Sequence, residues 1–599
     1  MKRRRIPATP SGSAFALLAA VLLTLAAGRA AAAQVASYEL TLDVDPAARS
    51  VRVDAHVEVE GDGDLALHLA PFARDIESGG TFEAELGTEP VTGQRAWRLQ
   101  ASDLASGAEV ALSYVLDVAP EVEGIALHLG EREGYLLSES AWYPVQLEAL
   151  LPRPTPYRLS VRLPDGLIAA GGGTIEAGAG ATTIRHRAPG RPFFAYGPYE
   201  RAAEGALELW LPATSAVQGE DLLPQLAPAV DDIVTRYENR FGEACEAVRL
   251  VAVTRRGGWG APCALLLSED TFGSLAARDE VGSGTYSFLA HELAHTWWGN
   301  RVVPASPAYG LLVEGMANYL SAWSVETRFG ADAAASMWRT WRIDAFGDEA
   351  LAGLTILDDA YYTVAYTKGA WVHRMLAGWI GEETYLQALG EMAHEASRPD
   401  LASFRQRLER ASGLDLERFF DEWVDGSAYP RYELDGAAGA WTLRNTGDAA
   451  TPPLPVELDG ERRRVTVAPG EALELTATTV RLDPTDALLI RPARVNAATR
   501  ALAATVMERL MAALATGDPE SVTTLFAEAG PGVEAIAGLA GEMVVDEWRL
   551  QRADDGPPPT LTYQLEATLD GRALTGPLVI SLDPENGPRT VESVRLTYR

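Results

Sequence analysis

Basic residues are scarce in this sequence, and lysine is almost absent. The 599 residues include 51 Lys and Arg against 83 Asp and Glu, which gives a formal net charge of −32 at pH 7. A surface of this charge repels nucleic acids and anionic membranes, so neither is an expected partner. Lysine occurs only as Lys2 and Lys368. Most of this shortage reflects a compositional bias towards arginine, which makes the position of Lys368 informative.

Cysteine is also rare, since Cys245 and Cys263 are the only two. They do not form a C-x-x-C motif, and two cysteines at this separation make a poor metal site. In an oxidising compartment they could form one disulfide bond. Two buried free thiols are an equally good interpretation.

Long hydrophobic runs are absent after the first 33 residues. A basic stretch at residues 2–5 precedes an apolar stretch at residues 14–27, and alanines at 31–33 supply small residues for cleavage before Gln34. This order predicts a secretory signal peptide at residues 1–33. The apolar stretch is shorter than the ~20 residues of a membrane-spanning helix, although an uncleaved anchor is the alternative. We therefore expect an exported protein, periplasmic or secreted, that is soluble after signal cleavage.

The remaining sequence predicts a multidomain α+β fold, and 47% of the chain is apolar, as in globular proteins with cores. Residues 34–200 alternate apolar and polar side chains with a period of two, as in residues 38–44 and 51–59, and predict an N-terminal β-saddle or β-sandwich. Residues 201–428 predict a mixed domain of strands followed by helices. A strand is predicted at 248–253, and helical spacing occurs at residues 222–241, 287–298, 311–328 and 367–380.

Two smaller domains are predicted after residue 428. Residues 429–492 contain short strands and a hairpin turn begun by Asp459-Gly460, which predicts a small β-sandwich. Residues 493–599 predict a helix packed on a curved antiparallel sheet, loosely similar to nuclear-transport-factor-like domains. The apolar face of that helix is expected at Leu502, Val506, Leu510 and Leu514, and Asp570-Gly571 is expected to join two of the strands.

The most specific chemical signal is the H-E-x-x-H motif from His291 to His295. Residues four apart lie on one face of a helix, so both imidazoles can bind one Zn²⁺ at ~2.0–2.1 Å. Glu292 is rotated by about 100° from His291, beside the metal rather than on it, where a general base is needed. An amphipathic helix without metal is the alternative for a lone motif of this kind.

A third ligand follows at a suitable position. Catalytic zinc sites have three protein ligands and keep one position open for water. Eighteen residues separate His295 from Glu314, which lies in the sequence Glu314-Gly-Met-Ala-Asn-Tyr319. Two histidines and one carboxylate complete the zinc site, and we interpret the other six histidines as surface or packing residues.

These motifs resemble the membrane-alanyl-aminopeptidase family of gluzincins, peptidase family M1. The spacing of H-E-x-x-H to the E-G-x-A-x-Y glutamate is the same, Trp297-Trp-Gly-Asn300 is similar to the family's W-x-G-N, and Tyr366-Thr-Lys-Gly369 is similar to its Y-x-K-G. The resemblance extends from about residue 36 to 490 and implies a thermolysin-like catalytic domain. It also implies that the Tyr366 hydroxyl stabilises the oxyanion, with Tyr361 and Tyr362 as rival candidates, and that Lys368 falls on the family's lysine.

One departure from the family concerns the substrate's amino terminus. The family's G-x-M-E-N strand carries a glutamate that binds the free α-amine, but here the aligned residues are Gly257-Gly-Trp-Gly-Ala261. Gly260 aligns with the family's glutamate, and Ala261 aligns with its asparagine. The family's D-E-P signature is also absent, and Ala141-Trp-Tyr-Pro144 occupies that region. The small residues are expected to widen the cleft and to let a longer peptide pass. Amino-terminal anchoring is therefore in doubt, unless another carboxylate such as Glu139 substitutes.

The sequence thus predicts a zinc metallopeptidase acting on a peptide or protein, with Zn²⁺ on His291, His295 and Glu314 and with Glu292 and Tyr366 as catalytic residues. The main alternatives are an ordinary aminopeptidase with a substitute carboxylate and a peptidase-like binding protein without catalysis. An epoxide hydrolase on the same scaffold and a relative of the glycyl-aminopeptidases are further alternatives.

Overall fold

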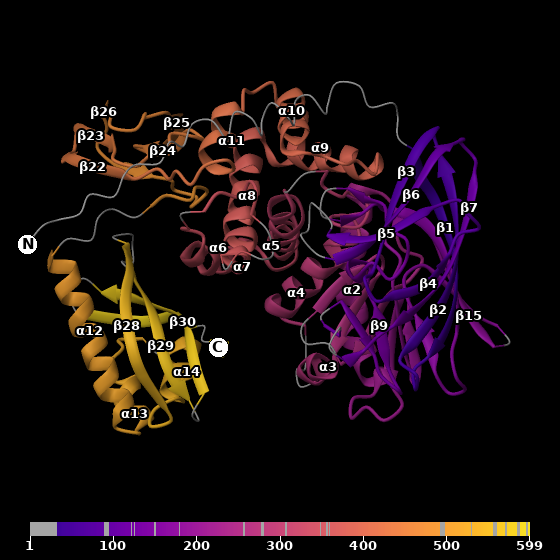
Figure 1. Ribbon diagram of the computed structural model, residues 1–599. Helices are drawn as coiled ribbons and strands as arrows, with labels where there is room; N and C mark the ends of the chain where they lie inside the picture. Colours follow the sequence, from indigo (N-terminus) through magenta and orange to yellow (C-terminus); the bar gives the residue numbers. More distant parts are fainter. Residues whose placement is uncertain are drawn as a thin grey trace, which may run out of the picture. The chain divides into compact units, whose positions relative to one another are not determined.

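The molecule is a mixed α+β protein, as predicted (Figure 1). The computed structural model describes residues 33–598 except for 89–94, 121–122, 125, 149–150, 179, 255–257, 277–280, 306–307, 348, 355–357, 359, 492–496, 529, 555–559, 570–571, 584–586 and 595–596. The predicted signal peptide lies almost wholly outside the described residues. In the part of the chain that is described, no helix combines the length and hydropathy needed to cross a bilayer.

The chain divides into two compact units. The first comprises residues 1–285, 292–306 and 393–398, and the second comprises residues 286–291, 307–392 and 399–599. The first unit is mainly strands and the second begins with helices.

The N-terminal strands of the first unit confirm the predicted alternation. Strands β1 (Gln34–Asp45) and β2 (Ser50–Glu60) pair antiparallel and bury every second residue along most of their length. They lie at the centre of a seven-stranded sheet with the order β14-β15-β12-β1-β2-β7-β4. The other members are β4 (Ala73–Glu77), β7 (Glu109–Asp117), β12 (Thr155–Arg162), β14 (Thr174–Gly178) and β15 (Ala181–Gly190).

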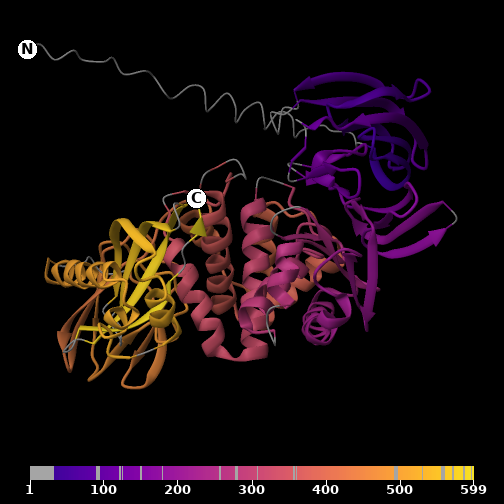
Figure 2. The same ribbon diagram turned by 90° about the horizontal axis from the view of Figure 1, so that it is seen from below.

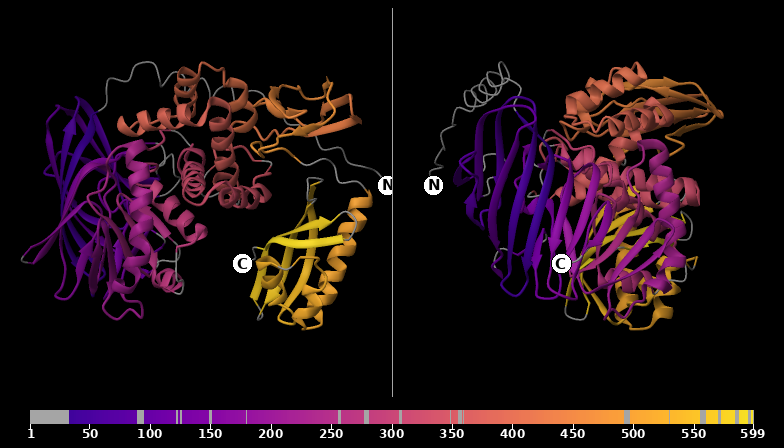
Figure 3. Two further views of the ribbon diagram at one scale, coloured as in Figure 1. Left: turned by 180° about the vertical axis from the view of Figure 1, so that it is seen from behind. Right: turned by 90° about the vertical axis from the view of Figure 1, so that its right-hand side faces the viewer.

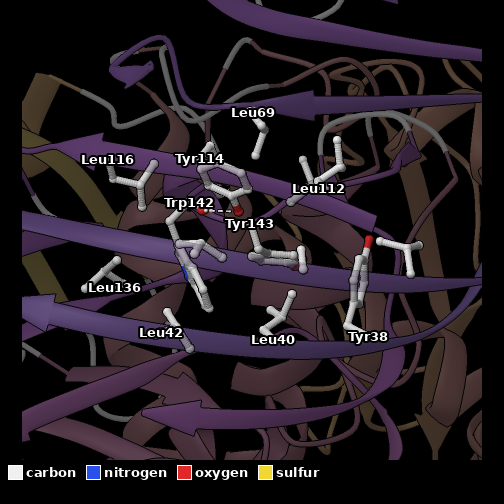
Figure 4. Packing of buried hydrophobic residues seen from close by; sticks show 14 of the residues in the cluster. Tyr38, Leu40, Leu42, Leu69, Leu112, Tyr114, Leu116, Leu136, Trp142 and Tyr143 are labelled. Atoms are coloured by element: carbon white, nitrogen blue, oxygen red, sulfur yellow. Dashed lines mark hydrogen bonds between the residues drawn. The ribbon is translucent and has the colours of Figure 1, made fainter. Parts of the chain in front are cut away.

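The core of this part is aromatic as well as aliphatic (Figure 4). Tyr114 donates a hydrogen bond from its hydroxyl to the carbonyl oxygen of Trp142 at 3.0 Å, and the Trp142 ring contacts Tyr143 edge-on. The segment from Ala141 to Pro144, which replaces the family's D-E-P signature, therefore serves as core packing. Three smaller sheets complete this part. One contains β3 (Gly63–Leu69), β5 (Glu83–Thr88) and β6 (Arg95–Leu104), and another contains β8 (Leu127–Leu129), β9 (Gly134–Leu136), β13 (Ile168–Ala170) and β16 (Phe194–Gly197). The third pairs β10 (Leu147–Glu148) with β11 (Leu151–Pro152).

A five-stranded sheet follows in the first unit, with the order β17-β18-β19-β21-β20. The predicted strand is β19 (Val248–Val253), which is parallel to β18 (Leu207–Pro212) and β21 (Ala264–Ser268). The edge strand β20 (Gly258–Ala261) runs antiparallel to β21. Strand β17 (Tyr199–Glu204) forms the other edge, and helix α2 (Gly219–Phe241) contacts both β17 and β18.

One disulfide bond ties this sheet to the end of α2. Cys245 and Cys263 are bonded, with their Cα atoms 5.4 Å apart. Cys263 has a positive φ of 57° in the turn between β20 and β21. The bridge therefore fixes the connection of the edge strand β20, and it settles the choice between disulfide and free thiols that the sequence leaves open.

Helices dominate the part of the second unit that precedes its sheets (Figure 2). The predicted helices at 311–328 and 367–380 are present, but each begins as a π-helical turn, η3 (Gly310–Gly315) before α5 (Met316–Phe329) and η4 (Val364–Lys368) before α8 (Gly369–Ile380). Helices α5 and α8 contact each other. The remaining helices are α6 (Ala331–Asp344), α7 (Tyr361–Thr363), α9 (Glu382–His394), α10 (Leu401–Ser412) and α11 (Glu417–Trp423), and α9 ends at residues of the first unit.

Two three-stranded sheets follow the helices, β22-β23-β26 and β25-β24-β27. The predicted hairpin at Asp459-Gly460 is confirmed, because it joins the antiparallel pair β24 and β25 and both residues have positive φ, 50° and 88°. Such a turn matches the twist of the strands that it connects. The strands are β22 (Tyr432–Ala437), β23 (Ala440–Asn445), β24 (Leu454–Leu458), β25 (Glu461–Val465), β26 (Ala472–Leu475) and β27 (Val480–Leu482).

The C-terminal part confirms the predicted helix on an antiparallel sheet (Figure 3). Val506, Leu510 and Leu514 of the first helix are buried, but Leu502 is 41% exposed and Ala503 is buried in its place. The buried face thus begins one residue later than predicted. The turn expected at Asp570-Gly571 lies outside the described residues. The elements are α12 (Ala497–Ala515), α13 (Pro519–Thr523), α14 (Pro531–Ala537), β28 (Met543–Asp554), β29 (Thr560–Leu569), β30 (Arg572–Asp583), β31 (Gly587–Val594) and β32 (Thr597–Tyr598).

Candidate active site

The H-E-x-x-H motif lies at the end of helix α4 (Ser283–Ala294). His295 follows the last helical residue with φ −64° and ψ −15°, so the right-handed turn continues through it and both histidines share one face. Glu314 approaches from η3, with its Oε2 atom 3.6 Å from His291 Nε2. One ligand atom from each of His291, His295 and Glu314 lies within 4.8 Å of the other two. The three predicted metal ligands are thus brought together.

The hydrogen bonds of the two imidazoles suit metal binding. His295 Nδ1 donates to the carbonyl oxygen of Trp298 at 3.0 Å, and His291 Nδ1 lies 2.9 Å from Asn318 Oδ1. Because both partners are acceptors, each Nδ1 carries the proton, and each Nε2 has the lone pair that a metal needs. Neutral imidazoles oriented by such partners are the usual ligands of Zn²⁺. The donor set therefore fits the predicted metal.

The carboxylate and the predicted oxyanion donor lie on the two π-helical turns. Glu314 belongs to η3 and Tyr366 belongs to η4. These turns pack without side chains between them, since a Cβ added to Gly315 would lie 2.8 Å from the Gly369 Cα. A π-turn adds one residue to the helix and re-aims the side chains around it, which is why such turns are frequent at functional sites. Gly315 and Gly369 permit the close approach of Glu314 and Tyr366.

Tyr366 contacts two of the three candidate ligands. Its ring stacks on the His291 ring, with the centroids 5.7 Å apart and an interplanar angle of 18°. Its hydroxyl is hydrogen-bonded to Glu314, and burial, together with the Glu314 charge, raises the pKa of Tyr366 far above its usual value. The hydroxyl therefore keeps its proton and can donate it in a hydrogen bond.

The two rival tyrosines lie close by but differ in environment. Tyr361 is buried, and its hydroxyl has no hydrogen-bond partner among the described residues. Tyr362 is 62% exposed, and its ring stacks on Tyr366 at 5.9 Å. Of the three hydroxyls, only that of Tyr366 is hydrogen-bonded to a candidate metal ligand.

Asn318 connects the two sides of the site, and sequence reasoning had not assigned it a role. Its Oδ1 accepts the His291 proton, and its Nδ2 donates to the Tyr366 carbonyl oxygen at 2.8 Å. One side chain thus sets the tautomer of a candidate ligand and the position of the segment that carries Tyr366. Its position between Glu314 and Tyr319 in the E-G-x-A-x-Y pattern is the sequence feature that could have indicated this role.

Lys368 is a structural anchor beneath Tyr366. Its side chain is fully buried, and Nζ donates to the carbonyl oxygens of Glu349 at 3.2 Å and Gly426 at 3.1 Å. The ammonium also lies 5.3 Å from the centre of the Tyr429 ring. Burial lowers its pKa to about 8, so the side chain is still mostly charged at neutral pH. The compact ammonium group of lysine can donate to two carbonyl oxygens and also lie over an aromatic ring. These contacts explain why lysine occurs at this position despite the bias towards arginine.

At the edge strand β20, the structure contradicts the expectation that small residues widen the cleft. A Cβ added to Gly260 would lie 2.4 Å from the Glu292 carbonyl oxygen and 2.8 Å from the His295 Cβ. The backbone of α4 therefore occupies the space that a side chain at Gly260 would need. The missing side chain does not widen the cleft at this point, contrary to the prediction from residue size, and Ala261 is buried.

Glu139 belongs to a buried polar network that the sequence did not reveal. Arg191 Nη1 donates to Glu139 Oε1, and Arg191 Nε donates to Asn300 Oδ1 at 3.1 Å. Asn300 Nδ2 in turn donates to the His295 carbonyl oxygen at 2.7 Å. Arg191 and Asn300 are almost completely buried, whereas the Glu139 side chain is 30% exposed. The candidate substitute carboxylate is thus already paired with a cation.

Part of the chain is similar to a known protein family. Residues 264–423 match the peptidase family M1 domain. Aminopeptidase M1 of Arabidopsis thaliana is 27% identical over 162 residues, which are 24% of this chain and 18% of that protein. Aminopeptidase N of Lactococcus lactis subsp. lactis is 26% identical over 193 residues, which are 28% of this chain and 21% of that protein. The match thus spans only about a fifth of these relatives.

A solved structure shows a similar fold. The crystal structure of Legionella pneumophila aminopeptidase A in complex with aspartic acid superposes with a TM-score of 0.57 and 16% identity. The superposition covers 86% of this chain and 66% of that chain. This chain therefore shares the general fold of that protein.

Proposed function

We propose that the chain is an exported zinc-dependent peptidase, because residues 264–423 match the peptidase family M1 domain. His291, His295 and Glu314 would hold the zinc ion, and Glu292 and Tyr366 would carry out the chemistry. The observation that supports this most strongly is the orientation of both imidazoles by acceptors at Nδ1, with the three ligand atoms within 4.8 Å of one another. Residues 1–33 would be the export signal, followed by domains at 34–200, 201–428, 429–492 and 493–599.

The chain's own residues have distinct tasks in this proposal. Zinc, when bound, would acidify the attacking water and polarise the scissile carbonyl. Glu292 is half-buried on α4 next to His291 and can accept the proton of the water and return it to the leaving amine. The Tyr366 hydroxyl, which keeps its proton, can donate a hydrogen bond to the carbonyl oxygen as negative charge develops there.

Metal analysis combined with a peptidase assay tests the proposal. Purified chain should contain about one zinc per molecule, as expected for a site with three protein ligands. Glu292→Gln should keep the metal and the fold but lower kcat at least about a hundredfold. Glu326→Gln, which changes an exposed glutamate of α5, is the matched control and should keep wild-type rates. Wild-type turnover by Glu292→Gln would show that Glu292 is not the general base.

A further inference from the structure

An exposed aromatic side chain lies next to the proposed oxyanion donor. Large hydrophobic side chains are rarely exposed in the described part of the chain, and Tyr362 is the most exposed of them at 62%. The others are Ile168, Phe329, Leu502 and Val544. Of these five exposed side chains, Tyr362 is the one whose ring stacks on Tyr366 of the candidate active site in the described part of the chain. Exposed apolar surface beside a reactive site is commonly covered by a ligand.

The ring of Tyr362 is held in place by its neighbours. It meets the buried Tyr361 ring edge-on, with the centroids 5.5 Å apart and an interplanar angle of 87°. One face stacks on Tyr366, with the centroids 5.9 Å apart and an interplanar angle of 27°. A ring fixed on two sides and open to solvent elsewhere is a preformed surface, because a ligand that contacts it need not order it first.

Three rings follow one another from Tyr362 to the candidate metal ligand. Tyr366 stacks on Tyr362 and also on His291, with interplanar angles of 27° and 18°. Under the proposed function the scissile carbonyl must lie at the Tyr366 hydroxyl. A side chain next to that carbonyl then lies within reach of the exposed part of the Tyr362 ring.

We propose that Tyr362 is a specificity-determining residue that packs against a large apolar or aromatic side chain next to the scissile bond. This inference rests on the proposed peptidase function. Aromatic pairs at such centroid separations gain energy beyond the burial of their area. Together with burial, this corresponds to a preference of roughly tenfold for a phenylalanine over an alanine at that substrate position.

Matched peptides that differ in one residue test this inference. Two series place Phe or Ala on either side of the cleaved bond, and kcat/KM is measured for each peptide with the full zinc-loaded chain. In one of the two series, the wild-type enzyme should cleave the Phe peptide with the higher kcat/KM. Tyr362→Ala should lower kcat/KM for that Phe peptide roughly tenfold and should change kcat/KM for the Ala peptide less than about twofold. Tyr362→Phe, which keeps the ring, should retain the preference. Phe329→Ala removes another exposed aromatic, one that packs on Tyr286, and serves as the control.

Binding measured in the Glu292→Gln background separates this inference from the peptidase proposal. The same peptides are titrated by fluorescence anisotropy with and without Tyr362→Ala. A Phe preference that Tyr362→Ala abolishes supports the inference even if wild type cleaves no peptide, an outcome that would overturn only the peptidase proposal. An equal loss on Phe and Ala peptides would make Tyr362 a support for Tyr366 and would overturn the inference, as would the absence of any Phe preference in wild type.

Discussion

His373 donates a hydrogen bond from Nε2 to the carbonyl oxygen of Leu311 at 2.8 Å. The bond runs from helix α8 to the π-helical turn η3, three residues before Glu314. Because Leu311 can only accept, Nε2 carries the proton, and Nδ1 accepts the Tyr385 hydroxyl at 2.6 Å. His373 is completely buried, and burial lowers its pKa to about 4. The sequence interpretation of His373 as a surface or packing residue missed this support for the turn that carries Glu314.

Replacing His373 should destabilise η3 and weaken metal binding. His373→Leu leaves the Leu311 carbonyl and the Tyr385 hydroxyl without their partner, which costs about 1–3 kcal/mol for a buried polar group. Because η3 positions Glu314, zinc affinity should fall as well, by roughly tenfold or more, as is usual for residues that support ligands. Denaturant unfolding and zinc competition with a chelator measure the two effects. His373→Leu/Tyr385→Phe also removes the orphaned Tyr385 hydroxyl but leaves the Leu311 carbonyl without a partner, so it should recover part of the stability but little of the zinc affinity.

The same histidine should make stability depend on pH. In the folded state its pKa is lowered to about 4, from an ordinary value of about 6.5 in the unfolded chain. Between these values the unfolded state binds the extra proton, so the free energy of unfolding should decrease as pH falls from about 6.5 to 4, by about 3 kcal/mol. Unfolding of the metal-free protein across this range should show the decrease. His373→Leu cannot titrate, so a slope of the same size in this variant would assign the effect to other groups.

Tyr366→Phe removes only the hydroxyl that is hydrogen-bonded to Glu314. We expect kcat to fall roughly a hundredfold or more with a smaller effect on KM, because the lost interaction strengthens in the transition state. Steady-state kinetics with one peptide at several pH values provide the measurement, and near-ultraviolet circular dichroism checks the fold. An unchanged kcat would move the oxyanion role to Tyr361, whose buried hydroxyl lacks a partner among the described residues.

The Cys245–Cys263 disulfide should stabilise the edge of the five-stranded sheet. The bridged residues are 18 apart in sequence, and closing a loop of this size in the unfolded chain contributes about 3 kcal/mol. Cys245→Ser/Cys263→Ser should lower the midpoint of thermal unfolding accordingly. Thiol titration of the unreduced, denatured chain isolated after export should detect no free thiol, and two thiols per chain would contradict the bridge.

The spacing of His291, His295 and Glu314 predicted their convergence, because the first two are one helical turn apart and the third follows in a recognisable pattern. The strand at residues 248–253 and the Asp459-Gly460 hairpin were predictable for similar reasons, since both depend on local pattern. The π-turns η3 and η4 were not, because a single extra residue in a helix leaves no periodic signal. Arg191 and His373 were missed because their partners are distant in sequence. The direction of the missing Gly260 side chain, towards α4 rather than open space, depends on tertiary packing in the same way.

Tolerance of a blocked amino terminus is the prediction that most distinguishes this chain from an ordinary aminopeptidase. A buried α-ammonium needs a carboxylate partner, because an unpaired charge in a dry site is costly. Gly260 cannot carry one, since α4 occupies the space of its Cβ, and Glu139 is paired with the buried Arg191. Peptides with acetylated and free amino termini should therefore be cleaved with kcat/KM values within about tenfold of each other, a difference of about 1.4 kcal/mol.

The alternative is that Glu139 binds the amine despite Arg191, because its side chain remains partly exposed. A strong preference for the free amine that is lost in Glu139→Ala would establish this alternative and contradict the prediction. Glu139→Gln is the more informative variant, because it retains an acceptor for Arg191 while removing the charge. If the free-amine preference is absent in wild type and unchanged in Glu139→Gln, the carboxylate serves to hold Arg191. Through Asn300 it would then also hold the His295 carbonyl oxygen at the end of α4.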